Sequence, residues 1–142
     1  MKSAVPCIVL LMVFAGSIGE ATWDDANSRG LIPYWQDGGD WYTFFVFVNG
    51  SETASDVLYL RLEGPHGSPC SDTSTAYGIR AGEMLTFSTT PEVPVWVPTT
   101  ASYGWARFRA EEGGFIHPYC VIYNQVTQSG YTVPAYPEDH GF

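Results

Sequence analysis

The chain has 142 residues, of which 45% are hydrophobic and 15% aromatic, and it carries a formal net charge of −9 at pH 7. A chain this acidic repels phosphate backbones and anionic membrane surfaces, so nucleic-acid binding is excluded as an expected function. The apolar and aromatic content is too high for a disordered chain and is sufficient for one folded domain.

Residues 1–21 have the pattern of a secretory signal peptide. Lys2 precedes an apolar run at 8–15, and Gly19 and Ala21 provide small residues for a cleavage site. The run is too short to span a bilayer, although a buried N-terminal helix or an uncleaved anchor is the alternative interpretation. We expect cleavage after Ala21 or Gly19, a secreted, periplasmic or cell-surface location, and no membrane insertion of the mature chain.

Strand-type periodicity dominates the rest of the chain. Residues 41–48 are β-branched or aromatic throughout, which predicts a central strand covered on both faces. Residues 56–63 and 102–109 each alternate in a way that predicts one buried and one outward face. Further strands are predicted at 31–35, 75–79, 83–88, 93–97, 119–126 and 131–133.

The pattern of short strands and glycine-rich turns predicts an all-β fold. With about seven to nine strands and no helical period after the signal peptide, we expect a single antiparallel β-sandwich, immunoglobulin-like or jelly-roll-like. The domain is expected over residues 22–132. Residues 133–142 contain two prolines and are expected to form an irregular tail.

The start of this domain is similar to the start of certain secreted bacterial proteins of unassigned function. In those proteins an Ile-Pro-Tyr strand is followed by a Tyr-Thr-Phe strand that ends at Asn. The resemblance covers about 20 residues and is carried by Ile32, Pro33, Tyr34, Tyr42, Thr43, Phe44 and Asn49. It implies a bacterial β-sandwich and supplies no active site.

Asn49-Gly50-Ser51 also matches an N-glycosylation acceptor. Asn-Gly at the end of a strand is explained by the turn alone, and the bacterial resemblance argues against a glycan.

Two cysteines, Cys70 and Cys120, remain once Cys7 leaves with the signal peptide. An exported chain meets an oxidising compartment, so we expect these two residues to form a disulfide. The loop-entropy relation gives such a bond about 4 kcal/mol of stabilisation. Two free buried thiols or half of a metal site are the alternatives.

Asp37 and Asp40 flank two glycines and form a weak candidate for a calcium site, because Ca²⁺ takes oxygen ligands. A hairpin turn in which the aspartates satisfy local amides is the simpler interpretation. The histidines, His66, His117 and His140, lack zinc-ligand spacing. We therefore expect no metal and no cofactor.

No catalytic motif stands out either. The sequence lacks a Gly-x-Ser-x-Gly nucleophile turn. Glu111 and Glu112, with Glu63, could form a glycosidase-like carboxylate pair, but adjacent glutamates in a glycine hairpin are more typical of a solvated turn. The protein is therefore predicted not to be an enzyme.

The best functional clue is a set of aromatic and arginine side chains that the strand pattern places on faces opposite the core. Exposed Trp and Tyr suit protein interfaces or stacking on sugars. The proposed interaction surface consists of Tyr59, Arg61, Tyr103, Trp105, Arg107 and Arg109. We expect a non-catalytic sandwich that works through protein contacts or self-association as a cell-surface, matrix or assembly subunit. A carbohydrate-binding module for polysaccharide and a small secreted hydrolase are the alternative hypotheses.

Overall fold

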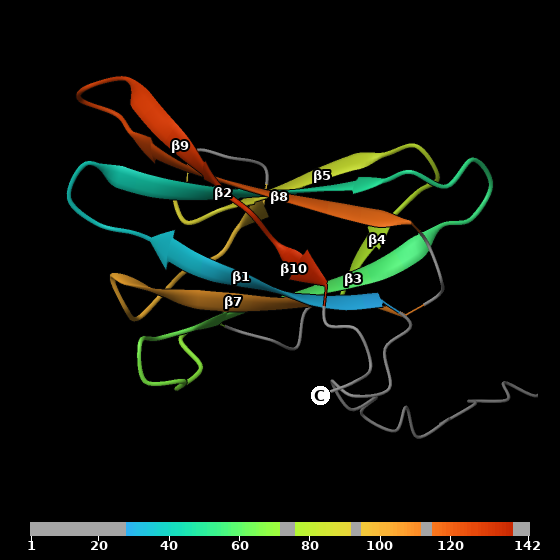
Figure 1. The fold of residues 1–142 in the computed structure, drawn as a ribbon, viewed down its shortest axis with the longest axis horizontal. Helices are drawn as coiled ribbons and strands as arrows, with labels where there is room; N and C mark the ends of the chain where they lie inside the picture. Colours follow the sequence, from blue (N-terminus) through green and yellow to red (C-terminus); the bar gives the residue numbers. More distant parts are fainter. Residues whose placement is uncertain (1–27, 72–75, 92–94, 112–114, 138–142) are drawn as a thin grey trace, which may run out of the picture.

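The computed structural model describes residues 28–71, 76–91, 95–111 and 115–137, which form two five-stranded sheets (Figure 1). The first sheet contains β1 (Ser28–Gln36), β3 (Asp56–Glu63), β4 (Tyr77–Ile79), β7 (Tyr103–Ala110) and β10 (Tyr136–Pro137). The second sheet contains β2 (Trp41–Asn49), β5 (Met84–Ser88), β6 (Val95–Trp96), β8 (Ile116–Asn124) and β9 (Ser129–Val133). The signal-peptide prediction falls on residues 1–21, outside the described part.

The strand order is β10-β1-β7-β3-β4 in the first sheet and β6-β5-β2-β8-β9 in the second. Neighbouring strands are antiparallel with the exception of β5 and β6, which pair in parallel. The expected all-β fold is confirmed, and the two layers in Figure 1 are consistent with a β-sandwich. The described residues hold ten strands, because β10, a two-residue edge strand too short to give a periodic signal, adds to the nine predicted, whereas β6 falls within the strand predicted at 93–97.

The core lies between the sheets and is built from the inward residues of each strand. Along β3, Leu58, Leu60 and Leu62 are buried, as the alternation predicted. Phe47 of β2 links the layers, because its ring centroid lies 5.6 Å from that of Phe87 in its own sheet and 5.4 Å from that of Phe108 in the first sheet. Aromatic packing across the gap therefore contributes to the cohesion between the sheets.

Strand β1 contains an irregularity that turns a tryptophan into the core. Its register against β7 shifts between Ile32 and Trp35, and Trp35 is fully buried. The Trp35 indole N–H donates to the carbonyl oxygens of Glu63, at 3.1 Å, and Trp105, at 2.9 Å. Gly104 permits this close approach of strands, since a Cβ there would overlap the Glu63 carbonyl oxygen. The Ile-Pro-Tyr triplet thus marks a β-bulge.

Two buried polar residues fix the ends of β2. Thr43 Oγ1 accepts from the backbone N–H of Gln36, at 2.9 Å, and donates to its carbonyl oxygen, at 2.7 Å, which ties β2 to β1 across the sheets. The Asn49 side chain donates to the carbonyl oxygens of Ala54 and Ile79 and accepts from the Ser51 N–H. Asn49 is fully buried, so the folded protein has no room for a glycan there.

The C-terminal segment crosses from one sheet to the other. Strand β9 extends the second sheet, and β10 then pairs with Gly30 and Leu31 at the edge of the first sheet (Figure 1). The expectation of an irregular tail is wrong at Tyr136–Pro137. Proline is tolerated in β10 because an edge strand does not need every backbone N–H for pairing.

Candidate functional site

The predicted interaction residues on β3 and β7 lie together on the outer face of the first sheet. Tyr59 pairs in register with Arg109, Arg61 with Arg107, and Glu63 with Trp105. Arg29 of β1 continues the row of Arg109 and Tyr59. Tyr103 lies at the end of β7 and is half exposed. We call this surface the arginine face and define it as Arg29, Tyr59, Arg61, Glu63, Trp105, Arg107 and Arg109.

The aromatic rings of the arginine face are themselves covered by arginines. The Arg107 guanidinium carbon lies 4.6 Å from the centroid of the Trp105 ring, and that of Arg109 lies 4.3 Å from the Tyr59 ring. These are cation–π distances. The ring faces are therefore occupied within the chain, which leaves less aromatic surface for stacking on a ligand than the sequence predicted.

Glu63 is a residue of the arginine face whose burial the sequence did not predict. The alternation placed it outward, but its side chain is only 1% exposed. Its Oε1 lies 2.6 Å from Arg61 Nε and 3.8 Å from Arg107 Nε, without hydrogen-bond geometry, so the contacts are ion pairs. Arg109 forms a further ion pair, at 3.3 Å, with Glu111. Two carboxylates thus pair with three arginines of the face, which is typical of a structural network.

The second sheet differs sharply in charge. None of its five strands contains Asp, Glu, Lys or Arg, whereas β1, β3 and β7 of the first sheet contain six such residues in total. The outward side chains of β2 and β8 form one surface that we call the apolar face, defined as Tyr42, Phe44, Val46, Val48, His117, Tyr119, Val121 and Tyr123. The opposite side chains of both strands are directed to the core.

The pairing of β2 and β8 makes the apolar face continuous. Val46 lies opposite Tyr119 and Phe44 opposite Val121, while the Phe44 and Tyr123 rings meet edge to face at 6.4 Å. Tyr119 is 53% exposed. Met84 and Trp96, which are 64% and 51% exposed, extend the same side of the sheet. Large exposed apolar surfaces of this kind mark interaction sites.

The apolar face was missed because the sequence predicts β2 as a strand covered on both sides. The structure places β2 centrally, but the residues on its outer side are only half-buried. The available signal was the lack of charge in residues 41–49 and 118–137.

The predicted disulfide is wrong for this structure, in which Cys70 and Cys120 are free, buried thiols. Cys120 lies in β8 inside the core, with its Sγ 3.8 Å from the carbonyl oxygen of Tyr34. Cys70 lies outside β3, where its backbone bonds to Leu62 and Thr100. Burial raises the pKa of Cys70 to about 11 and that of Cys120 to about 12, so neither thiol is activated.

Asp37 and Asp40 lie in the β1–β2 turn, where Gly38 and Gly39 have positive φ. The Asp37 carboxylate accepts from the Thr99 hydroxyl at 2.9 Å, and the Asp40 carbonyl oxygen accepts from the Gln125 N–H. Within the described residues, no three His, Cys, Asp or Glu side chains are grouped for a metal. These contacts support the turn interpretation over calcium binding.

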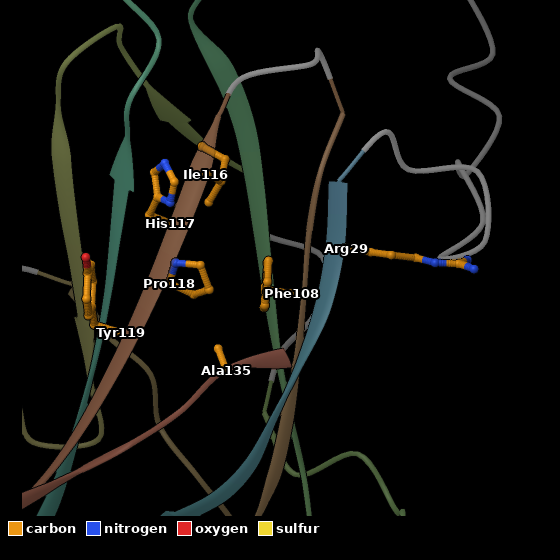
Figure 2. Close-up of a pocket in the computed structure, with 7 residues that line it drawn as sticks. All are labelled: Arg29, Phe108, Ile116, His117, Pro118, Tyr119 and Ala135. Carbon is orange, nitrogen blue, oxygen red and sulfur yellow. The ribbon is translucent and has the colours of Figure 1, made fainter. Parts of the chain in front are cut away.

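A pocket of about 270 Å³ opens beside β8 (Figure 2). Figure 2 shows Ile116 and Pro118 on the side of β8 that faces Phe108, with His117 and Tyr119 on the opposite side. Arg29 extends away from the pocket. The titratable side chains around the pocket therefore point in different directions, an arrangement that does not bring an acid and a base onto one substrate.

No helix suited to crossing a membrane occurs in the part of the chain that the structure describes.

Searches against protein-family models, curated proteins and solved structures gave no match to this chain.

Proposed function

We propose that this is a secreted, non-catalytic β-sandwich protein that acts by binding another protein through the apolar face. The observation that carries the proposal is the absence of Asp, Glu, Lys and Arg from every strand of the second sheet, in a chain with a net charge of −9. The centres of protein interfaces are depleted of charge and rich in aromatic residues. The apolar face has this composition.

The export, the bacterial origin and the type of sandwich in this proposal are carried over from the sequence. Export depends on the signal-peptide pattern of residues 1–21, and a bacterial origin depends on the resemblance around Ile32 and Asn49. An immunoglobulin-like or jelly-roll-like sandwich is likewise part of the proposal. The arginine face is a second candidate surface, but its rings are already stacked under Arg107 and Arg109. This favours the apolar face as the main contact.

Two tyrosines of nearly equal exposure allow a matched test. Tyr119 lies on the apolar face and is 53% exposed, whereas Tyr103 lies on the first sheet and is 51% exposed. A photo-crosslinking amino acid is placed at one position or the other, and the protein is produced in its native host before irradiation. We expect a discrete cross-linked protein from position 119 and none from position 103. Cross-linking from position 103 alone would instead assign the contact to the first sheet.

A carbohydrate-binding function would give a different result. Trp96 is the Trp that the described residues expose most, while Trp35 is fully buried and Trp105 lies under Arg107. Polysaccharides are therefore titrated against tryptophan fluorescence of the native protein and of Trp96→Ala. We expect no response. A saturable change that Trp96→Ala abolishes would replace protein binding with glycan binding.

A further inference from the structure

The second sheet ends in an edge strand, β9, whose outer side pairs with no other strand among the described residues. Its five residues are in regular register with β8, from Cys120 opposite Val133 to Asn124 opposite Ser129. Four of the five are exposed. An edge of this kind presents backbone N–H and C=O groups that can pair with another strand.

Natural β-proteins usually block such edges with charges, prolines, bulges or very short strands. The other three edges in this protein follow that rule, because β4 has three residues and β6 and β10 have two each, with Pro137 in β10. Strand β9 has none of these devices. It contains no charge, no proline and no register shift. The unprotected edge therefore lies on the sheet that also lacks charge.

We infer that β9 is a self-association edge, at which the β9 strands of two copies of this chain pair antiparallel and join their second sheets into one. The inference goes beyond the proposed function, since it assigns a second copy of the chain as the partner at the edge of the sheet, apart from the contact on the apolar face. Antiparallel pairing of identical strands is compatible with two-fold symmetry, in which each copy contributes the same residues.

Charge favours a second copy at an edge of the second sheet over an edge of the first sheet, whose strands β1, β3 and β7 hold six charged residues. Two copies with net charges of −9 repel one another, and the repulsion is smallest where carboxylates are farthest from the contact. Residues 118–137, which include β9 and the turn before it, contain no charged residue. A second copy also brings a strand that is already ordered by β8, so less entropy is lost than with a flexible peptide.

Pairing at β9 would also extend the apolar face. Thr132 pairs with Val121 and therefore lies on the same side of the sheet as Tyr119. In the joined sheet, the apolar faces of both copies lie on either side of the new strand pair. The edge and the face are separate contacts, so they can be tested separately.

The test uses Thr132→Lys and Thr53→Lys in the full chain. Both threonines are exposed, and both substitutions change the net charge equally, but Thr53 lies in the loop between β2 and β3. Sedimentation velocity is measured over a wide range of protein concentration. We expect a dimer for the native protein and Thr53→Lys, and a dissociation constant raised by roughly tenfold or more for Thr132→Lys.

Hydrogen exchange gives a second readout that is specific to the edge. Amides of Ser129–Val133 should gain protection as the dimer forms, whereas those of the edge strand Tyr77–Ile79 should not. A native protein that remains monomeric overturns the inference but not the proposed function, which the cross-linking tests. A dimer that survives Thr132→Lys and is lost in Tyr119→Lys also overturns it, and assigns self-association to the apolar face.

Discussion

Replacing Thr43 by valine tests whether a single hydroxyl holds β1 to β2. Thr43 is fully buried, and its Oγ1 serves both the N–H and the carbonyl oxygen of Gln36, at 2.9 and 2.7 Å. Valine has nearly the same shape but can neither donate nor accept. The substitution therefore leaves two backbone groups of Gln36 without these partners, while the packing around residue 43 is preserved.

The cost of Thr43→Val can be estimated from those two bonds. An unpaired buried backbone group costs about 1–3 kcal/mol, and Gln36 is only half-buried, so the lower value applies to each group. The added methyl group of valine recovers less than about 1 kcal/mol. We expect the free energy of unfolding to fall by about 1–2 kcal/mol, and the melting temperature to fall by roughly 3–10 °C.

Urea denaturation followed by tryptophan fluorescence measures this change. Thr86→Val is the matched control, because Thr86 is half-buried on the outer side of β5 and lies opposite Val46. The control should stay within about 0.5 kcal/mol of the native protein, and both variants should keep the native dependence on urea. Equal losses for the two variants, or a loss below about 0.5 kcal/mol for Thr43→Val, would refute the reasoning.

Four further predictions concern other contacts. Gly104→Ala should lower the free energy of unfolding by about 3 kcal/mol or more, since the added Cβ would overlap the Glu63 carbonyl oxygen. Gly78→Ala is the control, because a Cβ at residue 78 would meet no atom within 4 Å and should cost little. Chemical denaturation of the two variants measures the difference. Glu63→Gln removes the negative charge that Arg61 and Arg107, both partly exposed, share, and should lower the free energy of unfolding by about 2 kcal/mol. An unchanged urea midpoint would show that these ion pairs contribute nothing to stability. The two buried cysteines should resist alkylation at neutral pH until urea unfolds the chain, and a disulfide found by non-reducing mass spectrometry would contradict this. The pKa values of the two thiols are raised to about 11 and about 12, so burying the neutral thiols stabilises the fold fully below about pH 9. This stabilisation is lost as the pH rises from about 9 through the pKa values of the folded protein. An unfolding midpoint that stays constant above about pH 9 would argue against the burial of the thiols.

Periodicity was sufficient to predict the long strands and their faces. The alternation of Leu58 and Tyr59, and of Phe108 and Arg107, places each residue on the side that the structure shows. Such patterns are local, because burial of one face imposes a period of two on each strand. They do not show which strands pair, so the assignment of each strand to one of the two sheets could not be predicted.

The candidate site was harder to predict for the same reason. A strand with apolar residues on both faces, such as 41–48, can be covered on both sides or can present one face to a partner, and the sequence is the same in either case. The burial of Glu63 depends on Arg107 of a strand distant in sequence. The cysteine pair was predicted from compartment alone, and the cross-sheet geometry that a disulfide needs cannot be read from spacing.

The pairing of β1 has a consequence for how the chain folds during synthesis. Its neighbours are β7 and β10, so the first strand of the sandwich can pair only after strands much later in the sequence have been synthesised. The aromatic strand β2 likewise has β5 and β8 as partners, both later in the chain. Contacts this distant in sequence slow folding and leave apolar strands exposed in the nascent chain. The two sheets therefore cannot be completed until nearly all of the described strands have been made, and until then β1 and β2 lack their partners.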